Sequence, residues 1–542
     1  MLATVAATAR TLIASGMLTP VLPRPRLARL ALRLPFLAPG AGAAVEAHAA
    51  ARPHAVALID DAGALTWDEL DERVNRLANA LCEHPAAERG SGRVAFMVRN
   101  GREALECYAA AGRAGLAAVP LNTWASPREV DAVVASQQPL AVIGAAEFRD
   151  VLDATDLRGA LRLEVGGDGT YEQALADAAT RPPPVRASAT VVIHTSGTTG
   201  IPKGAERRLR LSNVQALVGF LEKVPLHRRD RFLVAPPLFH AFAQGMTSVG
   251  LVLGATLVLP RQFDPEGFLA AVATHRVTAA ALVPVMLRRI LEVQGPVPQT
   301  LRTVVLSGEP LSEHLRVQAE GRFGRVFYDL YGSTEVGWAA IATPSDQRSK
   351  PGSVGTPARG MRVFAADEDG RVLPAGREGR LFAATGFEFD RYTGEASDPA
   401  ELDGALELGD RGWVDEDGYV FVAGRADDMI VSGGENIYPS EVEAVLDEHP
   451  DVADAAVVGV ADDEYGQVLH AFVVPRQGQE IDADAVREFL RARLARFKVP
   501  KHLEVVEQLP RTASGKVVRD ALTPPASRPS NRDDPRNRSS TR

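Results

Sequence analysis

Short apolar runs alternate with helical stretches over most of the chain. The runs are rich in Val, Leu and Ala and occupy residues 93–98, 140–143, 231–234, 255–259 and 303–306. Stretches of helical character, such as residues 67–82 and 268–275, separate many of them. A helix that returns the chain between two buried strands makes those strands parallel. The alternation therefore predicts a large α/β region, which we place at residues 46–423.

The pattern changes twice after this alternation. Two Gly- and Asp-rich segments, residues 367–370 and 415–418, are typical of tight turns between strands. From residue 424 the chain becomes a compact series of expected elements: a helix at 440–449, strands near 455–460 and 470–474, and a helix at 484–494. Because about 100 residues are enough for an independent domain, we predict a small α+β domain over residues 424–522.

The two ends of the chain lie outside these domains. Residues 1–45 contain five arginines and no acidic residue, but lack the start and the cleavage site of a signal peptide. We interpret them as a basic arm, of which residues 1–37 either contact the inner face of a membrane or pack on the protein itself. Residues 523–542 are rich in Pro, Ser, Asn and Arg, and we expect them to be disordered.

One uncharged stretch is long enough to span a membrane. Residues 235–260 carry no Asp, Glu, Lys or Arg. Two prolines, His240 and Gln244 interrupt the stretch, which is unusual for a spanning helix. We therefore predict that it forms buried strand and helix in a core.

Composition narrows the functional classes. The 542 residues are 46% hydrophobic and 24% charged, as in globular enzymes, and they exceed the size of a single core. The net charge of -9 provides no basic field, so nucleic acid is not an expected partner. Two cysteines supply neither a disulfide framework nor a metal cluster and favour a reducing cytoplasm. The oligomeric state stays open.

The strongest chemical signal is His194-Thr-Ser-Gly-Thr-Thr-Gly-Ile-Pro-Lys-Gly204, which follows an apolar run. Its glycines let backbone N–H groups approach an anion, and its hydroxyls and ammonium complete the shell, so we expect phosphate there. A Walker A loop is absent, because the only Gly-Lys pair, Gly515-Lys516, is followed by Val517. The motifs of a Rossmann dinucleotide site and of a nucleophile-elbow hydrolase are also absent.

Residues 195–204 resemble the phosphate-binding signature of the adenylate-forming family, which includes acyl-CoA synthetases, aryl-CoA ligases, luciferases and adenylation domains. Other motifs of that family follow in its order. They are Val119-Pro-Leu-Asn122 upstream, Phe239-His240, Tyr331-Gly-Ser-Thr-Glu335, Leu408-Gly-Asp410, Gly424-Arg-Ala-Asp427, Ser432-Gly-Gly-Glu-Asn-Ile-Tyr-Pro439 and Pro510-Arg-Thr-Ala-Ser-Gly-Lys516. The chain looks most similar to bacterial fatty-acid-CoA ligases. The resemblance implies a large N-terminal α/β domain of several subdomains and a small mobile C-terminal α+β domain.

The resemblance also implies an ATP site and a Mg²⁺ ligand. The phosphates would be held by Thr195, Ser196, Gly197, Thr198, Thr199, Gly200 and Lys203. The rest of the nucleotide would contact Gly308, Glu309, Tyr331, Gly332, Ser333, Thr334, Asp410, Arg425 and Lys516. Glu335 would bind Mg²⁺, which usually needs one or two protein carboxylates beside phosphate oxygens. Leu408 departs from the family, which usually has Thr or Ser there, so a local hydroxyl is lost.

Lys516, Thr195 and His240 are the catalytic residues that the resemblance implies. The Lys516 ammonium would offset charge between the acid carboxylate and the α-phosphate. His240 would be a gate or polar contact near the acyl carbon, although a lone histidine in an uncharged stretch is equally typical of a core. For the second step, the small domain would turn about Asp427, so that Gly433, Gly434 and Asn436 face CoA.

The expected reaction joins a carboxylic acid to CoA, with ATP converted to AMP and diphosphate through an acyl-adenylate. We expect a medium- or long-chain fatty acid. An aryl-CoA ligase or another acyl-adenylating enzyme remains an alternative. A catalytically silent acyl- or nucleotide-binding protein is least favoured, because Lys516, Glu335 and Asp410 are all present.

Overall fold

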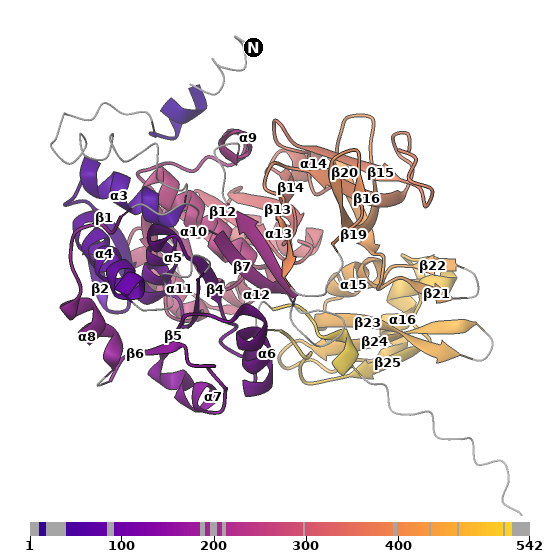
Figure 1. Ribbon diagram of the computed structural model, residues 1–542. Coiled ribbons are helices and arrows are strands. Elements are labelled where there is room, and N and C mark those ends of the chain that lie inside the picture. Colours follow the sequence, from indigo (N-terminus) through magenta and orange to yellow (C-terminus); the bar gives the residue numbers. More distant parts are fainter. Residues whose placement is uncertain are drawn as a thin grey trace, which may run out of the picture. The chain divides into compact units, whose positions relative to one another are not determined.

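A computed structural model describes residues 10–17, 40–83, 92–167, 169–184, 190–195, 203–208, 213–295, 297, 299–393, 398–432, 435–462, 465–512 and 515–522. By its internal contacts the chain divides into two units (Figure 1). The first is Met1–Asp427 with Ala513–Lys516, and the second is Asp428–Thr512 with Val517–Arg542. This division falls a few residues after position 424, where we expected the small domain to begin. Most of the expected basic arm and the whole expected tail lie outside the described residues.

Two large sheets form the body of the first unit. The eight-stranded sheet has the order β14-β13-β12-β11-β9-β10-β1-β2. Its strands are β1 (Val56–Asp60), β2 (Gly63–Thr66), β9 (Arg231–Val234), β10 (Thr256–Val258), β11 (Ala279–Leu282), β12 (Thr303–Ser307), β13 (Phe327–Ser333) and β14 (Gly337–Ala342). The seven-stranded sheet has the order β17-β8-β7-β4-β3-β5-β6. Its strands are β3 (Arg93–Met97), β4 (Ala117–Pro120), β5 (Ala141–Ala145), β6 (Leu161–Val165), β7 (Thr190–Thr195), β8 (Lys203–Arg208) and β17 (Arg391–Thr393).

The interior of both sheets is parallel, which confirms the α/β prediction. Antiparallel strands lie at the edges: β2 and β14 flank the eight-stranded sheet, and β8 and β17 end the seven-stranded one. The apolar runs did not predict these strands, because β8 (Lys-Gly-Ala-Glu-Arg-Arg) and β17 (Arg-Tyr-Thr) are short and charged. Strand β17 is at the edge of its sheet, where charged side chains are common, whereas β8 pairs with β17 on one side and β7 on the other.

A third sheet completes the first unit. It contains β15 (Arg362–Ala366), β16 (Gly379–Ala384), β18 (Glu401–Leu402), β19 (Ala405–Val414) and β20 (Val420–Arg425). Both predicted turns are confirmed here: the Gly370 N–H donates to the Asp367 carbonyl at 3.1 Å, and the Gly418 N–H donates to the Asp415 carbonyl at 3.0 Å. The second turn joins β19 to β20, so that Asp410 and Arg425 stand in register on adjacent strands.

Helices cover the two large sheets, as Figure 1 shows. They are α3 (Ala41–Ala51), α4 (Trp67–Glu83), α5 (Arg102–Ala114), α6 (Pro127–Gln137), α7 (Arg149–Asp153), α8 (Thr170–Asp177), α9 (Asn213–Lys223), α10 (Ala241–Leu253), α11 (Pro265–Thr274), α12 (Pro284–Glu292), α13 (Glu313–Phe323) and α14 (Asp346–Ser349). Helix α3 runs across residue 45, where we expected the basic arm to end, and its Val45 is fully buried in the core.

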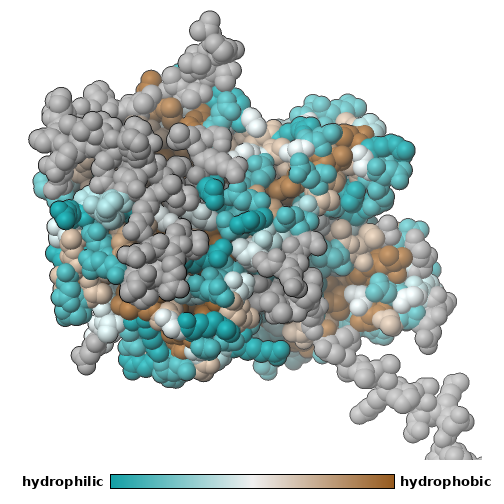
Figure 2. Space-filling view, viewed as in Figure 1, coloured by the Kyte–Doolittle hydropathy of each residue, from teal (hydrophilic) through white to brown (hydrophobic). Residues whose placement is uncertain are grey.

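The uncharged stretch lies in the core, as predicted. It contains the segment that connects β9 to α10, helix α10 itself and strand β10. Leu257 of β10 and its partner on β9, Phe232, are both buried. Among the described residues, no helix combines the length and the apolar character needed to cross a bilayer. On the face drawn in Figure 2, hydrophobic residues form separate small areas among hydrophilic ones.

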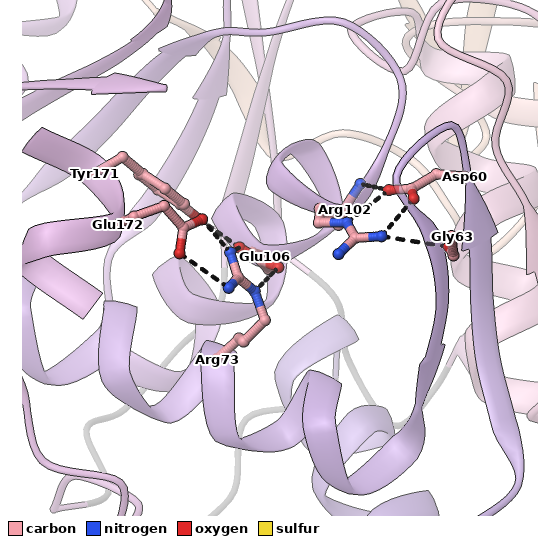
Figure 3. Close-up of polar contacts among 7 residues, drawn as sticks. All are labelled: Asp60, Gly63, Arg73, Arg102, Glu106, Tyr171 and Glu172. Atoms are coloured by element: carbon pink, nitrogen blue, oxygen red, sulfur yellow. Dashed lines mark hydrogen bonds and ion pairs between the residues drawn. The ribbon is translucent and has the colours of Figure 1, made fainter. Parts of the chain in front are cut away.

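Ion pairs around one buried carboxylate tie three helices of the first unit together (Figure 3). Arg73 of α4 contacts Glu106 of α5 at 2.6 Å and Glu172 of α8 at 2.6 Å. The Tyr171 hydroxyl also donates to Glu106 at 2.6 Å. The Glu106 side chain is fully buried, and burial raises its pKa to about 6, against the opposing effect of the Arg73 guanidinium. This carboxylate therefore joins three helices through a satisfied polar network.

The second unit is a small α+β domain, as predicted. Its strands are β21 (Ile430–Ser432), β22 (Glu435–Ile437), β23 (Val452–Asp462), β24 (Gly466–Pro475) and β25 (His502–Val505). Its helices are α15 (Pro439–Asp447) and α16 (Ala483–Arg491). The apolar faces of both helices pack on the sheet, and Val442, Leu446, Val486 and Leu490 are fully buried.

Candidate active site

Three of the predicted nucleotide residues form one cluster in the first unit. The Tyr331 hydroxyl on β13 donates to Oδ2 of Asp410 on β19 at 2.6 Å. Arg425 on the neighbouring strand β20 places Nη1 3.5 Å from the other oxygen of Asp410. The Asp410 side chain is only 13% exposed. The Tyr331 hydroxyl therefore binds one oxygen of the Asp410 carboxylate, and the Arg425 guanidinium lies near the other.

The protonation of Asp410 reflects two opposing effects. Burial raises the pKa of Asp410 above its ordinary value. The Tyr331 hydrogen bond and the positive charges of Arg425 and Lys516 lower that pKa again. The cluster therefore stabilises the carboxylate form, whose two oxygens can accept hydrogen bonds from a diol.

The unusual Leu408 has a structural role next to this cluster. Leu408 is 4% exposed and packs in an apolar cluster that includes Val336 and Leu381. Its carbonyl accepts a hydrogen bond from Arg425 Nη1 at 3.3 Å. The hydroxyl that the family usually has here is thus replaced by apolar contacts, while the backbone still helps to place Arg425.

Glu335 lies in a second polar cluster. The Tyr392 hydroxyl donates to the Glu335 carboxylate, and Lys203 Nζ lies 5.7 Å from the centre of the Tyr392 ring. Pairing of β17 with β8 brings Tyr392 and Lys203 together. The half-buried Arg207 of β8 donates to the Thr334 carbonyl at 2.5 Å, and burial of its guanidinium lowers the pKa of Arg207 to about 10.

This second cluster fits a nucleotide-bound Mg²⁺. Glu335 supplies one carboxylate, which suits a metal that takes most of its other ligands from phosphates and water. Lys203, near the Tyr392 ring, supplies a positive charge for the phosphates. Tyr392 orients the carboxylate in the way that hydrogen-bond partners orient metal ligands elsewhere.

The turn between β13 and β14 presents Glu335. A Cβ atom on Gly332 would lie 1.9 Å from the Gly337 carbonyl oxygen, so only glycine fits at this position. The Ser333 hydroxyl accepts hydrogen bonds from the amides of Glu335 at 3.2 Å and Val336 at 3.4 Å. In this structure Gly332 and Ser333 shape the turn. Thr334 accepts the hydrogen bond from Arg207 through its backbone carbonyl.

His240 is placed by a well-anchored loop at the start of α10. The amide of Leu238 donates to the Asn100 side chain at 2.8 Å, and Tyr108 donates its hydroxyl to the Leu238 carbonyl at 2.7 Å. The His240 ring packs on Phe239 with centroids 4.3 Å apart. Its Nε2 is buried and has no hydrogen-bond partner within the described part of the chain. Burial, with a smaller effect of the Lys516 charge, lowers the pKa of His240 to about 4, so the ring is neutral near pH 7.

Lys516 belongs to the first unit by its contacts, although the residues on both sides of its segment belong to the second. Its charge acts on both His240 and Asp410. The preceding Gly515 has a φ of 93°, and a Cβ there would lie 2.5 Å from Val285 Cγ1 and 3.8 Å from Glu309 Oε1. Lys516, His240, Asp410 and the segment of Glu309 thus share one region.

Several predicted residues cannot be placed in this site. Ser196, Gly197, Thr198, Thr199, Gly200, Gly433 and Gly434 lie outside the described residues, as do the side chains of Thr195 and Asn436. His194 is placed: it lies on β7, opposite Gly204 of β8. Neither of its ring nitrogens has a hydrogen-bond partner among the described residues, and burial lowers its pKa to about 4. His194 is therefore a half-buried strand residue whose ring nitrogens are enclosed.

Sequence reasoning missed Tyr392 and Arg207. Tyr392 is 57 residues from Glu335 in the chain, and Arg207 is 127 residues from Thr334. Tyr392 stands in a short strand without a recognisable motif, and Arg207 lies three residues after the end of the phosphate motif. Only the pairing of those strands signals their role, so local pattern alone did not reveal it.

Comparisons with known proteins show the family of the chain. A family model described as AMP-binding enzyme matches residues 45–392, and the model of the AMP-binding enzyme C-terminal domain matches residues 441–516. A feruloyl-CoA synthase of an Amycolatopsis species is 37% identical over 479 residues, covering 86% of this chain and 95% of the relative. The fatty acid–[acyl-carrier-protein] ligase ScoC of Streptomyces coeruleorubidus is 32% identical over 492 residues, covering 88% and 94%. The o-succinylbenzoate CoA synthetase of Bacillus subtilis, solved with its acyl-adenylate, has a TM-score of 0.79 and 28% identity, covering 89% and 98%.

Proposed function

Because the chain belongs to the AMP-binding enzyme family, whose relatives here include acid–CoA ligases, we propose that it joins an aromatic or similarly compact carboxylic acid to CoA. The enzyme uses ATP and Mg²⁺ and proceeds through an acyl-adenylate, as adenylate-forming enzymes do. The observation that carries the proposal is the convergence of Asp410, Tyr331, His240 and Lys516 in one region of the first unit.

The choice of acid departs from our expectation of a medium- or long-chain fatty acid. The feruloyl-CoA synthase matches this chain at higher identity than the fatty acid ligase does, 37% against 32%. A fatty acid is the second candidate, supported by the match to ScoC over 88% of this chain.

In the first step, the site must bring two anions together. Asp410 would accept hydrogen bonds from the ribose hydroxyls, while Tyr331 keeps its carboxylate oriented. Lys516 would stabilise the negative charge that develops between the acid oxygen and the α-phosphate. The carboxylate oxygen then bonds to the α-phosphorus as diphosphate leaves. The His240 ring is neutral, and its Nε2 has no hydrogen-bond partner among the described residues, so it would contact the acyl end of the substrate.

The metal and the second substrate complete the assignment. Glu335 would hold Mg²⁺, which neutralises phosphate charge when bound, and Tyr392 would orient Glu335. The phosphate loop from Thr195 to Lys203 would hold the leaving diphosphate. In the second step the CoA thiol displaces AMP from the acyl-adenylate. We assign the turn of the small domain to Asp427, and the CoA-facing loop to Gly433, Gly434 and Asn436.

Separate assays of the two half-reactions test this function. A panel of aryl and fatty acids is scored for AMP release with ATP, Mg²⁺ and CoA, and AMP release from at least one acid is expected. Lys516→Ala should abolish adenylate formation and spare thioester formation from supplied acyl-adenylate. Absence of AMP release across the panel would contradict the ligase activity, and equal loss in both half-reactions would contradict the role of Lys516.

A further inference from the structure

Arginines gather at one edge of the eight-stranded sheet, where its parallel strands begin. Arg231 is the first residue of β9, and Arg302 directly precedes β12. Thr278, just before β11, lies between them: its amide donates to the Arg231 carbonyl at 3.0 Å, and its carbonyl accepts from the Arg302 amide at 3.0 Å. Arg325 stands two residues before the next strand of the sheet, β13. Arginines therefore mark the amino ends of three out of four neighbouring strands.

The segments that lead into these strands are strongly basic. Six arginines, two histidines and a single acidic residue occupy residues 226–231, 275–278, 300–303 and 324–326. We call these four segments the arginine face. The acidic residue, Asp230, is 2% exposed and pairs with Arg302. Arg229, Arg276 and Arg325 are exposed and form no ion pair among the described residues. The face therefore concentrates positive charge on a chain whose net charge is -9.

The N-terminal segment of residues 10–17 folds onto this face. The Arg228 amide donates to the Ser15 carbonyl at 2.9 Å, and a Cβ on Gly16 would lie 2.8 Å from Arg228 Cγ. The Thr11 hydroxyl donates to Glu222 at 3.2 Å. Ile13, two residues before Ser15, is 61% exposed. This part of the expected basic arm thus packs on the protein and places an exposed apolar side chain near the arginines.

The arginine face and the proposed active site lie at opposite ends of the same strands. Arg325 precedes β13, whereas Tyr331 is six residues further along, which corresponds to about 20 Å in an extended strand. In the same way, Arg231 begins β9, and His240 follows the carboxyl end of that strand. A partner bound to the arginine face would therefore leave the site open.

The chemistry of the face fits a surface of anionic phospholipids. Guanidinium groups form bidentate hydrogen bonds with phosphates, and anionic leaflets attract clustered arginines. Segments that lie in a membrane interface also bury apolar side chains between the head groups, and Ile13 is available for this. Single-stranded nucleic acid is usually bound with aromatic stacking, but the four segments contain no Tyr, Phe or Trp.

We propose that the arginine face and Ile13 dock the protein on membranes that contain anionic phospholipids. The guanidinium groups bind lipid phosphates, and the Ile13 side chain enters the boundary between head groups and acyl chains. The inference goes beyond the proposed function and does not depend on the acid that is activated, because no residue of the face belongs to the proposed site.

Co-sedimentation of the full chain with lipid vesicles tests this inference. Wild type should bind vesicles of phosphatidylcholine and phosphatidylglycerol in equal parts, but not vesicles of phosphatidylcholine alone. Raised salt should release it, because salt screens exposed charges. The triple variant Arg229→Gln, Arg276→Gln and Arg325→Gln should bind about 100-fold more weakly, since each arginine near an anionic membrane contributes about fivefold. Ile13→Ser should weaken binding by about threefold to tenfold.

The matched control removes three exposed arginines outside the face, with Arg371→Gln, Arg377→Gln and Arg491→Gln. It should bind the mixed vesicles as wild type does, and thermal unfolding should show that both triple variants are folded. Wild-type binding by the face variant, or an equal loss in the control, would overturn the proposal. Binding of wild type to duplex DNA but not to mixed vesicles would also overturn it. If the face variant does not fold, Arg325→Gln decides: about fivefold weaker binding supports the proposal, and unchanged binding overturns it.

Discussion

Removal of the Tyr331 hydroxyl is the most direct test of the nucleotide site. The Tyr331→Phe substitution keeps the ring and removes the 2.6 Å hydrogen bond to Asp410. A hydrogen bond to a charged group contributes about 1.5–3 kcal/mol, equivalent to about 10- to 150-fold in affinity. Because Arg425 is already 3.5 Å from the other oxygen, the released carboxylate can turn toward it and recover part of the loss. We therefore expect KM for ATP to rise by about 10- to 30-fold.

The same substitution should change the pH dependence. The Tyr331 hydrogen bond lowers the pKa of Asp410, while burial raises it, so Tyr331→Phe should raise that pKa further. Protonated Asp410 can accept fewer hydrogen bonds. As the pH is lowered, kcat/KM for ATP should therefore begin to fall at a higher pH in the variant than in wild type.

The assay is diphosphate release at varied ATP and pH. Tyr328→Phe is the control, because Tyr328 is on the same strand and its hydroxyl has no hydrogen-bond partner among the described residues. If Tyr331→Phe keeps KM for ATP within about twofold of wild type, and kcat/KM falls at the same acidic pH as in wild type, the role assigned to Tyr331 is refuted.

Three further predictions concern other parts of the first unit. Tyr392→Phe should raise the Mg²⁺ concentration for half-maximal adenylation by about tenfold, because it removes the partner that orients Glu335; an unchanged Mg²⁺ titration would argue against the metal assignment. Gly515→Ala should slow adenylation at least about tenfold, because φ is 93° and the new Cβ would lie 2.5 Å from Val285; Val285→Ala should restore part of the rate, and a wild-type rate for Gly515→Ala would exclude this packing. Burial raises the pKa of Glu106 from 4.5 to about 6, so its contribution to stability falls by about 2 kcal/mol as pH rises through that window. Thermal unfolding at pH 4.5 and 7 should show this slope in wild type and lose it in Glu106→Gln; identical slopes would contradict it.

The apolar pattern was sufficient for the main elements of the fold. The run at residues 231–234 forms β9 with the predicted bounds, and the helix expected at 67–82 is α4 (Trp67–Glu83). Periodic burial is a local property, since it depends on which residues of one segment face the core, and so it can be read from a single stretch. The short charged strands β8 and β17 have no such periodicity, and their pairing could not be predicted.

The site divides in the same way. The resemblance of short motifs to those of the adenylate-forming family pointed to Tyr331, Asp410, Glu335 and Lys516 as candidate site residues. Tertiary structure alone decided what each of them contacts. Examples are the hydrogen bond between Tyr331 and Asp410, 79 residues apart, and that between Tyr392 and Glu335, 57 residues apart.

Residue type and local order therefore determined the family, the elements and the chemistry of this protein. The order of strands within its sheets decided the partners of these residues and the burial that shifts the pKa of Asp410. The physical reason is that secondary structure follows from short-range burial patterns, whereas the electrostatics and shape of a site depend on contacts between segments that only the folded chain brings together.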